Sequence, residues 1–411
     1  MKVLHGQYGA VMSETQMHDS RMNLNSLFTA AVDDYNPGMK GATLANYVEL
    51  KSFIKDDQGK IIGAMCVDKM DPEGKEFAVK AKNVVNCAGV HADDIRKMDK
   101  PDVEERIVPS RGTHLIFKKG MLTTENNGII IPATSDGRLL FIINYFGHPM
   151  VGTTDVLTDM THNCEPSQDE IDFIIKELKP YFGDDYDYKG NLLSAWAGLR
   201  PLVKADTNVV EVDRSDFSIK DKAADFLKRK VRWLAMKLHS GKKNGSASIS
   251  RNHAIEVSEN GLISLMGGKW TSFRSQGEET IDRILKEYPD RFKDSVKHTT
   301  GQTLNFNLIG SYSRAQLRDG FIQNSTAVFQ QYEDFLVFEH KVPRDIAKHL
   351  IRQYGTASLR VVEIGKIRNN LNRLHEDYPF IESEVLYSMQ SEMAVKPNDI
   401  ICRRVPVSFI D

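Results

Sequence analysis

Residues 262–281, LISLMGGKWTSFRSQGEETI, join an apolar strand to an amphipathic helix through a double glycine. Gly267 and Gly268 have no Cβ atom, so the backbone of this turn can approach a planar ring closely. The helix that follows begins with free N–H groups and the positive end of its dipole, which suit an electron-rich ring edge such as that of a flavin. A simple strand-to-helix turn also uses two glycines, so this stretch alone leaves both interpretations open.

The composition is that of an ordinary folded protein. The chain has 411 residues, of which 41% are hydrophobic and 27% charged, enough for two or three domains. A formal net charge of −2 argues against a surface built for nucleic acid. The four cysteines form no C-x-x-C pair, which favours free or buried thiols over a disulfide or zinc framework. We therefore expect no metal site and no nucleic-acid partner.

Membrane contact is expected to be peripheral. No apolar run approaches the roughly 20 residues needed to span a bilayer. The first residues, MKVLHGQYGAV, lack the features of a signal or transit peptide. Residues 220–243, KDKAADFLKRKVRWLAMKLHSGKK, predict a basic amphipathic helix that could lie on an anionic membrane or dock on a partner. The alternative is a solvated helix packed on its own domain.

Two strand-rich blocks precede a helical region. NYVELKSFIKD and KIIGAMCVDKM predict a hairpin with Asp56, Asp57 and Gly59 in its turn, followed by a third strand, FAVKAKNVVNCAG. Residues 106–155 predict a second sheet. The pattern S-x-x-E at Ser167 and Glu170 predicts a capped helix. From about residue 312 the pattern is largely helical, so we expect an α/β (α+β) fold divided into residues 1–305 and 306–411.

Two other segments of the sequence contain small residues or a positively charged side chain of the kind that cofactor and substrate sites use. The strand within residues 82–96 ends at Cys87-Ala88-Gly89, followed by Asp93, and such a turn lets a dinucleotide pass close to the backbone. In AWAGLRPL, residues 195–202, Arg200 precedes Pro201, which we expect to stop a helix. An arginine fixed in this way can clamp a phosphate or carboxylate, or polarise a carbonyl.

SISRNHAIEV, residues 248–257, places Arg251 and His253 at the start of the strand pair that leads to Gly267. Together with Arg200 and Lys269, these side chains create a setting that suits an anionic substrate.

A series of motifs resembles the FAD-dependent glycerol-3-phosphate dehydrogenases, especially the mitochondrial, quinone-linked form. The resemblance covers nearly the whole chain except an insertion at 203–247. The motifs are HDSRMN (18–23), VVNCAGVHADDIRKMD (84–99), VPSRGTHLIF (108–117), PATSDGRLLF (132–141), VGTTD (151–155), SAWAGLRPLV (194–203), SRNH (250–253), GLISLMGGKWTSFRS (261–275), FIESEV (380–385) and DIICRR (399–404).

The resemblance implies oxidation of sn-glycerol 3-phosphate to dihydroxyacetone phosphate, with hydride passing to FAD and electrons to ubiquinone. It implies an FAD-dependent oxidoreductase fold in which residues 1–305 contain a mixed-sheet substrate domain and residues 306–411 form an all-helical C-terminal domain. The implied location is the mitochondrial inner membrane, with peripheral attachment. A homodimer and a subunit of a larger complex are both compatible with it.

The resemblance also assigns site residues. Arg200 and Arg251 match arginines that hold the substrate or its phosphate, and His253 is a candidate base. Lys269 and Thr271 match positions at the flavin and substrate face. The matches to FAD-binding turns are Gly89, Asp93, Gly267 and Gly268. The resemblance places His114, Thr154 and Asp155 near the substrate sheet but assigns them no chemical role.

The chain departs from the family at its beginning, since it contains no G-x-G-x-x-G turn to cradle the FAD pyrophosphate. We expect it to be a partial chain that lacks the N-terminal FAD-binding segment. One alternative is a catalytically inactive relic that serves as a structural or accessory subunit of a mitochondrial membrane complex. Another is a different oxidoreductase of the superfamily, such as an amino-acid oxidase, although GLRP, SRNH and GGKWTS argue against it.

Overall fold

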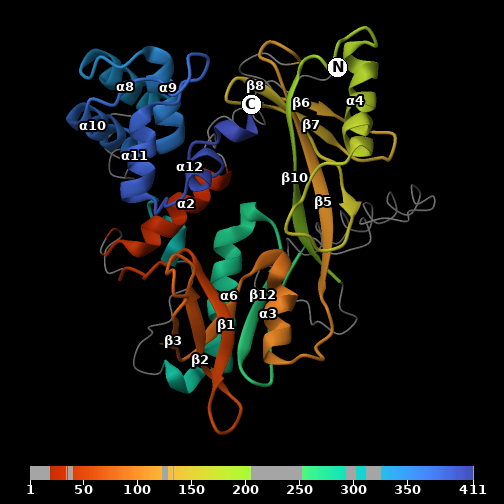
Figure 1. The fold of residues 1–411 in the computed structure, drawn as a ribbon, viewed down its shortest axis with the longest axis vertical. Coiled ribbons are helices and arrows are strands. Elements are labelled where there is room, and N and C mark those ends of the chain that lie inside the picture. The colour runs from red at the N-terminus through yellow and green to blue at the C-terminus, as the bar shows by residue number, and fades with distance from the viewer. Residues whose placement is uncertain are drawn as a thin grey trace, which may run out of the picture.

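Sheets dominate the first part of the chain, and helices make up its C-terminal part (Figure 1). The computed structural model describes residues 19–33, 35, 40–122, 128–132, 134–204, 252–292, 302–311 and 325–410. The basic segment 220–243 and most of the 203–247 insertion lie outside these residues. In the part of the chain that is described, no helix is both long and apolar enough to cross a membrane.

The predicted hairpin is confirmed. β1 (Val48–Lys55) pairs antiparallel with β2 (Ile61–Asp68), which pairs in turn with β3 (Glu76–Lys80). Asp56 closes the turn because its Oδ1 accepts hydrogen bonds from the backbone N–H groups of Gln58 and Lys60 at 2.9 and 2.8 Å. This is the local hydrogen bonding that makes aspartate a good turn residue.

The prediction of one strand over FAVKAKNVVNCAG is wrong, because the segment contributes to two sheets. β3 ends at Lys80, whereas β4 (Val84–Asn86) pairs in parallel with β12 (Leu262–Gly267). The side-chain amide of Asn86 fixes β4 in this second sheet by donating to the carbonyl of Ala92 at 2.9 Å and to the hydroxyl of Ser264 at 3.2 Å. The chain therefore changes sheets at residues 81–83.

The sheet that contains β4 has three strands in the order β11-β12-β4, with β11 spanning His253–Val257. α3 (Ala92–Asp99) packs on β12, and α6 (Phe273–Glu287) follows the glycine turn. A small apolar core joins this sheet to the start of the large one. Its members are Ala92, Ile107, Val203 and Met266, with Ala254 packed against them.

The large antiparallel sheet has the order β10-β5-β8-β7-β6, and β9 (Val156–Leu157) pairs with β5 at its side. The strands span Ile107–Phe117 (β5), Ile129–Ile131 (β6), Leu140–Tyr145 (β7), His148–Gly152 (β8) and Leu192–Val203 (β10). α4 (Gln168–Phe182) runs along this sheet (Figure 1). Leu115, Phe117 and Val151 of the sheet are buried in the same core as Ile174 and Leu178 of α4.

The expectation that Pro201 stops a helix is wrong, since Pro201 lies inside β10. It stands opposite Pro109 in the β5–β10 register. A proline cannot donate to a sheet ladder, so two prolines are tolerated where they face each other near the end of the strand pair. Arg200 is therefore fixed by a strand and not by a helix end.

The C-terminal part is helical, as predicted from residue 312 onward. α8 (Ser325–Phe338), α9 (Arg344–Tyr354), α10 (Ser358–Arg368), α11 (Glu382–Ser391) and α12 (Pro397–Ile401) make up most of it. Its core contains a buried polar group, in which Glu384 Oε1 lies 2.8 Å from His349 Nε2 and accepts from the hydroxyl of Tyr354 at 3.1 Å. α2 (Asp19–Ala31) joins this region, because Thr29 Oγ1 accepts from the backbone N–H of Ile309 at 2.8 Å.

The capping box of α4 is confirmed. Ser167 Oγ accepts from the N–H of Glu170 at 3.3 Å, and Glu170 Oε2 accepts from the N–H of Ser167 at 3.2 Å. Two donors that a helix beginning would leave unsatisfied are thus paired.

Ser167→Ala is expected to destabilise the start of α4 by about 1 kcal/mol, because the first turn loses its side-chain acceptor. Hydrogen exchange measured by mass spectrometry should show the amides of residues 169–171 exchanging roughly fivefold faster. Ser391→Ala, at an exposed serine at the end of α11, is the control. Unchanged exchange in α4 would contradict the role given to the cap.

Candidate active site

Two features of the turn at the end of β12 require glycine at positions 267 and 268: the backbone conformation and the close packing of neighbouring atoms. Gly267 and Gly268 have φ values of +73° and +88°, a region that L side chains rarely adopt. A Cβ on Gly267 would lie 2.5 Å from Val203 Cγ2, and one on Gly268 would lie 2.5 Å from Gln276 Oε1. β10 and α6 therefore close on the turn from two sides.

The helical segment after the turn begins without a side-chain cap. Lys269 and Ser272 are the N-cap residues of η3 (Trp270–Ser272) and of α6, and neither side chain caps the helix it precedes. Gln276 instead holds the turn, because its Nε2 donates to the carbonyl of Lys269 at 2.7 Å. Lys269 and Thr271 are exposed. The close-packed glycines and the uncapped, positive helix end fit the ring of a flavin.

His253 lies next to the turn, since it is the cross-strand partner of Gly267. Its Nε2 is 2.7 Å from Glu279 Oε2 on α6, and the other oxygen of Glu279 accepts from the hydroxyl of Ser275 at 2.9 Å. The carboxylate fixes the orientation of the imidazole ring. A histidine oriented by a carboxylate is the arrangement found in many general bases.

Arg200 approaches the same turn from β10, because the carbonyl of the next residue, Pro201, lies 3.4 Å from the Cβ position of Gly267. Its Nη2 donates to Thr153 Oγ1 at 2.9 Å and its Nη1 to the carbonyl of Thr154 at 3.2 Å. The guanidinium rests on Gly112 of β5, where a Cβ atom would overlap it. Gly112 thus provides the space that Arg200 occupies.

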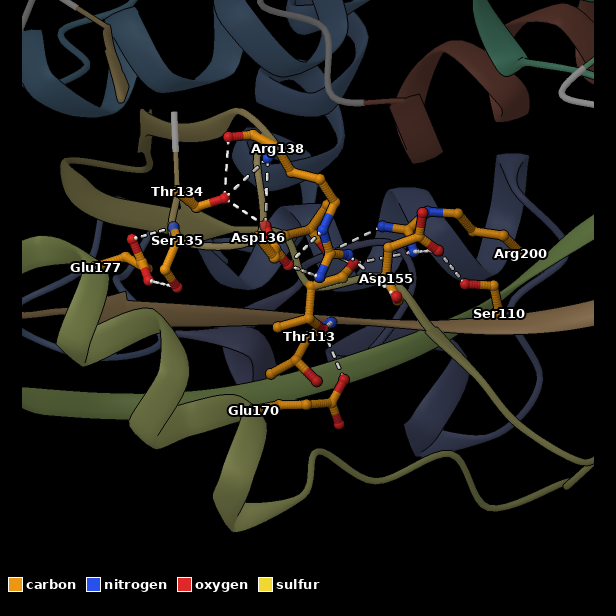
Figure 2. Close-up of polar contacts among 12 residues, drawn as sticks. Ser110, Thr113, Thr134, Ser135, Asp136, Arg138, Asp155, Glu170, Glu177 and Arg200 are labelled. Atoms are coloured by element: carbon orange, nitrogen blue, oxygen red, sulfur yellow. Dashed lines mark hydrogen bonds and ion pairs between the residues drawn. The ribbon is translucent and has the colours of Figure 1, made fainter. Parts of the chain in front are cut away.

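A polar network supports the segment that holds Arg200 (Figure 2). Asp155 Oδ1 accepts from the hydroxyl of Ser110 and lies 3.8 Å from Arg200 Nη1. On its other side, Arg138 donates from Nη1 to the carbonyl of Asp155 at 3.1 Å and from Nε to Asp136 Oδ2 at 2.7 Å. A hydroxyl group from β5 and charged groups from the loop after β8 and from the turn before β7 thus form one network that reaches Arg200.

Hydrogen bonds to α4 and to β5 fix the side chain of Thr154. Its hydroxyl donates to Glu170 Oε1 of α4 at 2.6 Å and accepts from the backbone N–H of Thr113 at 2.9 Å. Arg111 Nε is 2.7 Å from Glu170 Oε2 and balances the charge of that buried carboxylate. The carbonyl that receives Arg200 is therefore held by a helix and by a strand.

His114 is a neutral group beside this cluster. Its ring stacks on Trp196, with ring centroids 4.3 Å apart and an interplanar angle of 17°. A Cβ on Gly152 would overlap it, so a second glycine makes room for a side chain. Burial, together with the charge of Arg200, lowers the pKa of His114 to about 4. Among the described residues its buried Nδ1 has no hydrogen-bond partner, and it could accept a proton or a hydrogen bond from a ligand.

Gly89 and Asp93 lie on the neighbouring strand connection. Gly89 has a φ of +59° and begins η1 (Gly89–His91), which lies against β5 and β10. Asp93 is buried, and its Oδ2 accepts from the backbone N–H groups of Arg106 and Ile107 at 2.8 and 2.7 Å. Its other oxygen accepts from Arg96 at 2.6 Å. Asp93 therefore anchors α3 to the start of β5.

The structure thus brings together most of the residues that the sequence indicated. His253 pairs with Gly267 across the strands, and Pro201, the residue after Arg200, lies against the same glycine. Lys269 and Thr271 are exposed just after the turn, and the Gly89 turn lies against β10. Arg251 lies outside the described residues. Sequence reasoning missed Ser110, Gly112, Thr153, Arg138 and Glu279, and it gave no role to Asp155 or His114. A glycine within the otherwise bulky strand IVPSRGTHLIF is the signal that could have indicated Gly112.

NMR titration of the histidine side chains should show His114 titrating near pH 4, so that it is neutral at pH 7. Arg200→Met is expected to raise this pKa because a nearby positive charge is removed, while burial keeps the value below 6.5. The His114→Gln variant identifies the resonance. A His114 pKa that Arg200→Met leaves unchanged would show that the two groups do not interact.

Comparisons with known proteins agree with this geometry. The family described as "FAD dependent oxidoreductase" matches residues 4–223, more than half of the chain, and "C-terminal domain of alpha-glycerophosphate oxidase" matches residues 301–411. The probable mitochondrial glycerol-3-phosphate dehydrogenase of Dictyostelium discoideum is 31% identical over 98% of this chain. The mitochondrial glycerol-3-phosphate dehydrogenase of Homo sapiens is 33% identical, also over 98%. The chain spans 55% and 48% of the length of these two relatives.

A solved structure shares the fold. The glycerol-3-phosphate dehydrogenase from Bacillus halodurans, complexed with FAD, superposes with a TM-score of 0.67 at 23% identity, covering 95% of this chain and 65% of that one. The expected FAD-dependent oxidoreductase fold with a helical C-terminal part is confirmed. The chain therefore belongs to the FAD-dependent oxidoreductase family, among the relatives of the glycerol-3-phosphate dehydrogenases.

Proposed function

We propose that this chain contributes the substrate site and the flavin-facing turn of an enzyme that oxidises sn-glycerol 3-phosphate to dihydroxyacetone phosphate. The observation that carries the proposal is the guanidinium of Arg200, which lies on Gly112 and is held by Thr153 and Thr154, on the strand whose next residue, Pro201, lies against Gly267. A cation fixed next to a flavin-type turn is what the binding of an anionic alcohol requires. The mitochondrial glycerol-3-phosphate dehydrogenases among the relatives support this substrate.

Arg200 binds the substrate and orients it. Its planar fork can hold two oxygens of a phosphate, or polarise the oxygen at C2 as that carbon becomes a carbonyl. Lys269, exposed at the start of η3, adds a second positive charge. Arg251, adjacent in sequence to the β11 region, is proposed as the second substrate arginine. A bound FAD would supply the acceptor for the hydride from C2.

His253 is proposed as the base that takes the hydroxyl proton. Its Nε2 is engaged by Glu279, which orients the ring. His114 is the alternative acceptor, although its depressed pKa makes it a weaker base at neutral pH.

The turns at Gly89 and at Gly267–Gly268, with Lys269 and Thr271, are proposed to hold FAD. The backbone at these glycines leaves room for a cofactor, and the helix beginning would supply N–H groups and positive partial charge to its ring. Asp93 contributes by fixing α3 and the Gly89 turn against β5, because its carboxylate oxygens already accept hydrogen bonds within the protein.

Ubiquinone is proposed as the electron acceptor, and the mitochondrial inner membrane as the location, with peripheral attachment. The names of the relatives support a mitochondrial location. We further propose that residues 1–305 form the catalytic domain and residues 306–411 the helical domain, in a homodimer or a larger complex. A flavin-free accessory subunit is the less favoured alternative, because it would not need the close fit between Arg200 and Gly112.

Gly112→Ala tests the site because its Cβ would displace the guanidinium of Arg200. We expect kcat/KM for sn-glycerol 3-phosphate to fall on the order of 100-fold in flavin-loaded protein, as for other misplaced catalytic groups. Gly198→Ala is the matched control, since Gly198 pairs with Gly112 across the strands but nothing lies within 4 Å of its Cβ position. Its kcat/KM should stay near the original value, and equal effects of the two substitutions would contradict the proposed role of Arg200.

A further inference from the structure

The helical C-terminal part contains an apolar cavity remote in sequence from the candidate active site. Its volume is about 630 Å³, within the range typical of small-molecule sites. Its walls come from α11, from α12 and from the segments that flank them. The main lining side chains are Leu374, Phe380, Met389, Val395, Ile401 and Val405.

Apolar side chains of this cavity face solvent to an unusual extent. Met389 is 55% exposed, Val395 52%, Ile401 44% and Leu374 42%. Single exposed apolar residues are common on protein surfaces, but a group of them around one hollow marks a binding site. The apolar wall therefore suits the hydrocarbon part of a ligand.

The cavity floor lies where the helical part meets the large sheet. Phe380 and Val405 belong to a buried cluster against which Tyr145 and Phe146, at the end of β7, are packed. The rings of Phe380 and Phe146 are 5.1 Å apart between centroids. A floor held by two parts of the fold keeps the cavity open, as is common for ligand sites at such junctions.

The charge at the rim is positive. No aspartate or glutamate is among the described residues that line the cavity, whereas Lys396 is. The Lys396 ammonium lies 4.6 Å from the centre of the Tyr47 ring, and it has no carboxylate within ion-pair distance among the described residues. A cation on an aromatic face beside an apolar hollow remains available to an anion.

The carboxylate nearest in sequence, Asp399, is already engaged. It accepts from the hydroxyl of Tyr47 at 2.7 and 2.8 Å, and from the N–H groups of Val395 and Lys396 at 2.9 Å each. Arg403 lies 3.6 Å from its other side. Asp399 therefore fixes the backbone at the rim, and it is not an ion-pair partner of Lys396.

We propose that this cavity binds a long-chain monocarboxylate, with the hydrocarbon chain between α11 and α12 and the carboxylate on Lys396. The apolar wall excludes a polar ligand such as a sugar phosphate, because its hydroxyl groups would lose their hydrogen bonds with water. Among the described residues, the lining has no acidic side chain and the Lys396 ammonium has no carboxylate partner, so an anionic head is favoured over a cationic one. This assignment does not depend on the proposed enzymatic function.

Isothermal titration calorimetry of the full chain with sodium laurate, below its micelle concentration, tests the proposal. We expect saturable binding of one laurate and a loss of roughly fourfold in affinity for each CH₂ removed, measured with decanoate and octanoate. Lys396→Met, which keeps an apolar stem, should weaken laurate binding roughly tenfold. Lys189→Met, at a 74% exposed lysine beside α4, is the matched control and should bind laurate normally.

Three results would overturn the proposal. The first is binding of dodecyltrimethylammonium as tight as that of laurate, which would mean that the cavity does not select an anion. Ile401→Asp, which places a negative charge in the wall, could leave laurate binding unchanged in protein with an unaltered circular dichroism spectrum. Finally, laurate could fail to saturate while vesicles of phosphatidylcholine and phosphatidylserine bind through Met389 and Ile401, which would make this surface a membrane contact.

Discussion

The pairing of β10 with β5 is the constraint on which the candidate site depends. Its register places Gly198 opposite Gly112 and Arg200 opposite Ser110, so that a long side chain on one strand can lie across the glycine of the other. The same strand continues to Val203, which packs with Met266 beside the glycine turn. One antiparallel ladder thus sets the distance between Arg200, the proposed substrate cation, and the backbone that we propose faces the flavin.

Glycines act here as spaces for neighbouring groups. Gly112 admits the guanidinium of Arg200, Gly152 admits the ring of His114, and Gly267 admits the close approach of β10. Because these contacts come from strands and not from loops, the polar groups are held with little freedom. The network through Asp155 and Arg138 adds a second restraint on the same segment. Such preorganisation is the main way in which a protein stabilises charge that develops in a reaction.

Local signals in the sequence predicted local structure well. The Asp56–Gly59 turn, the capping box at Ser167 and the strand–glycine–helix unit at 262–281 each depend on neighbours within a few residues. The division of FAVKAKNVVNCAG between two sheets was not predictable in this way, because it depends on Asn86 meeting Ser264 across the fold.

In the candidate site, too, the sequence indicated individual residues but not their distant partners. Resemblance indicated Arg200, His253 and the glycines, but the partners that position them are distant in sequence. Glu279 reaches His253 from a helix, and Gly112 matters only because of the strand register. Pro201 looked like a helix stop because a proline's missing donor is equally compatible with a helix end and with this strand position. The positions of these partners are therefore determined by pairing and packing between distant segments, which the sequence pattern alone does not reveal.

The central claim is that Arg200 binds a phosphorylated alcohol and that the Gly267–Gly268 turn holds the flavin that oxidises it. The most direct measurement is the absorbance spectrum of the protein isolated from its native source, recorded without oxygen before and after addition of sn-glycerol 3-phosphate. The account predicts a flavin spectrum that this substrate bleaches and that glycine or proline leaves unchanged. A protein without flavin, or a flavin that is reduced by an amino acid and not by sn-glycerol 3-phosphate, would contradict it.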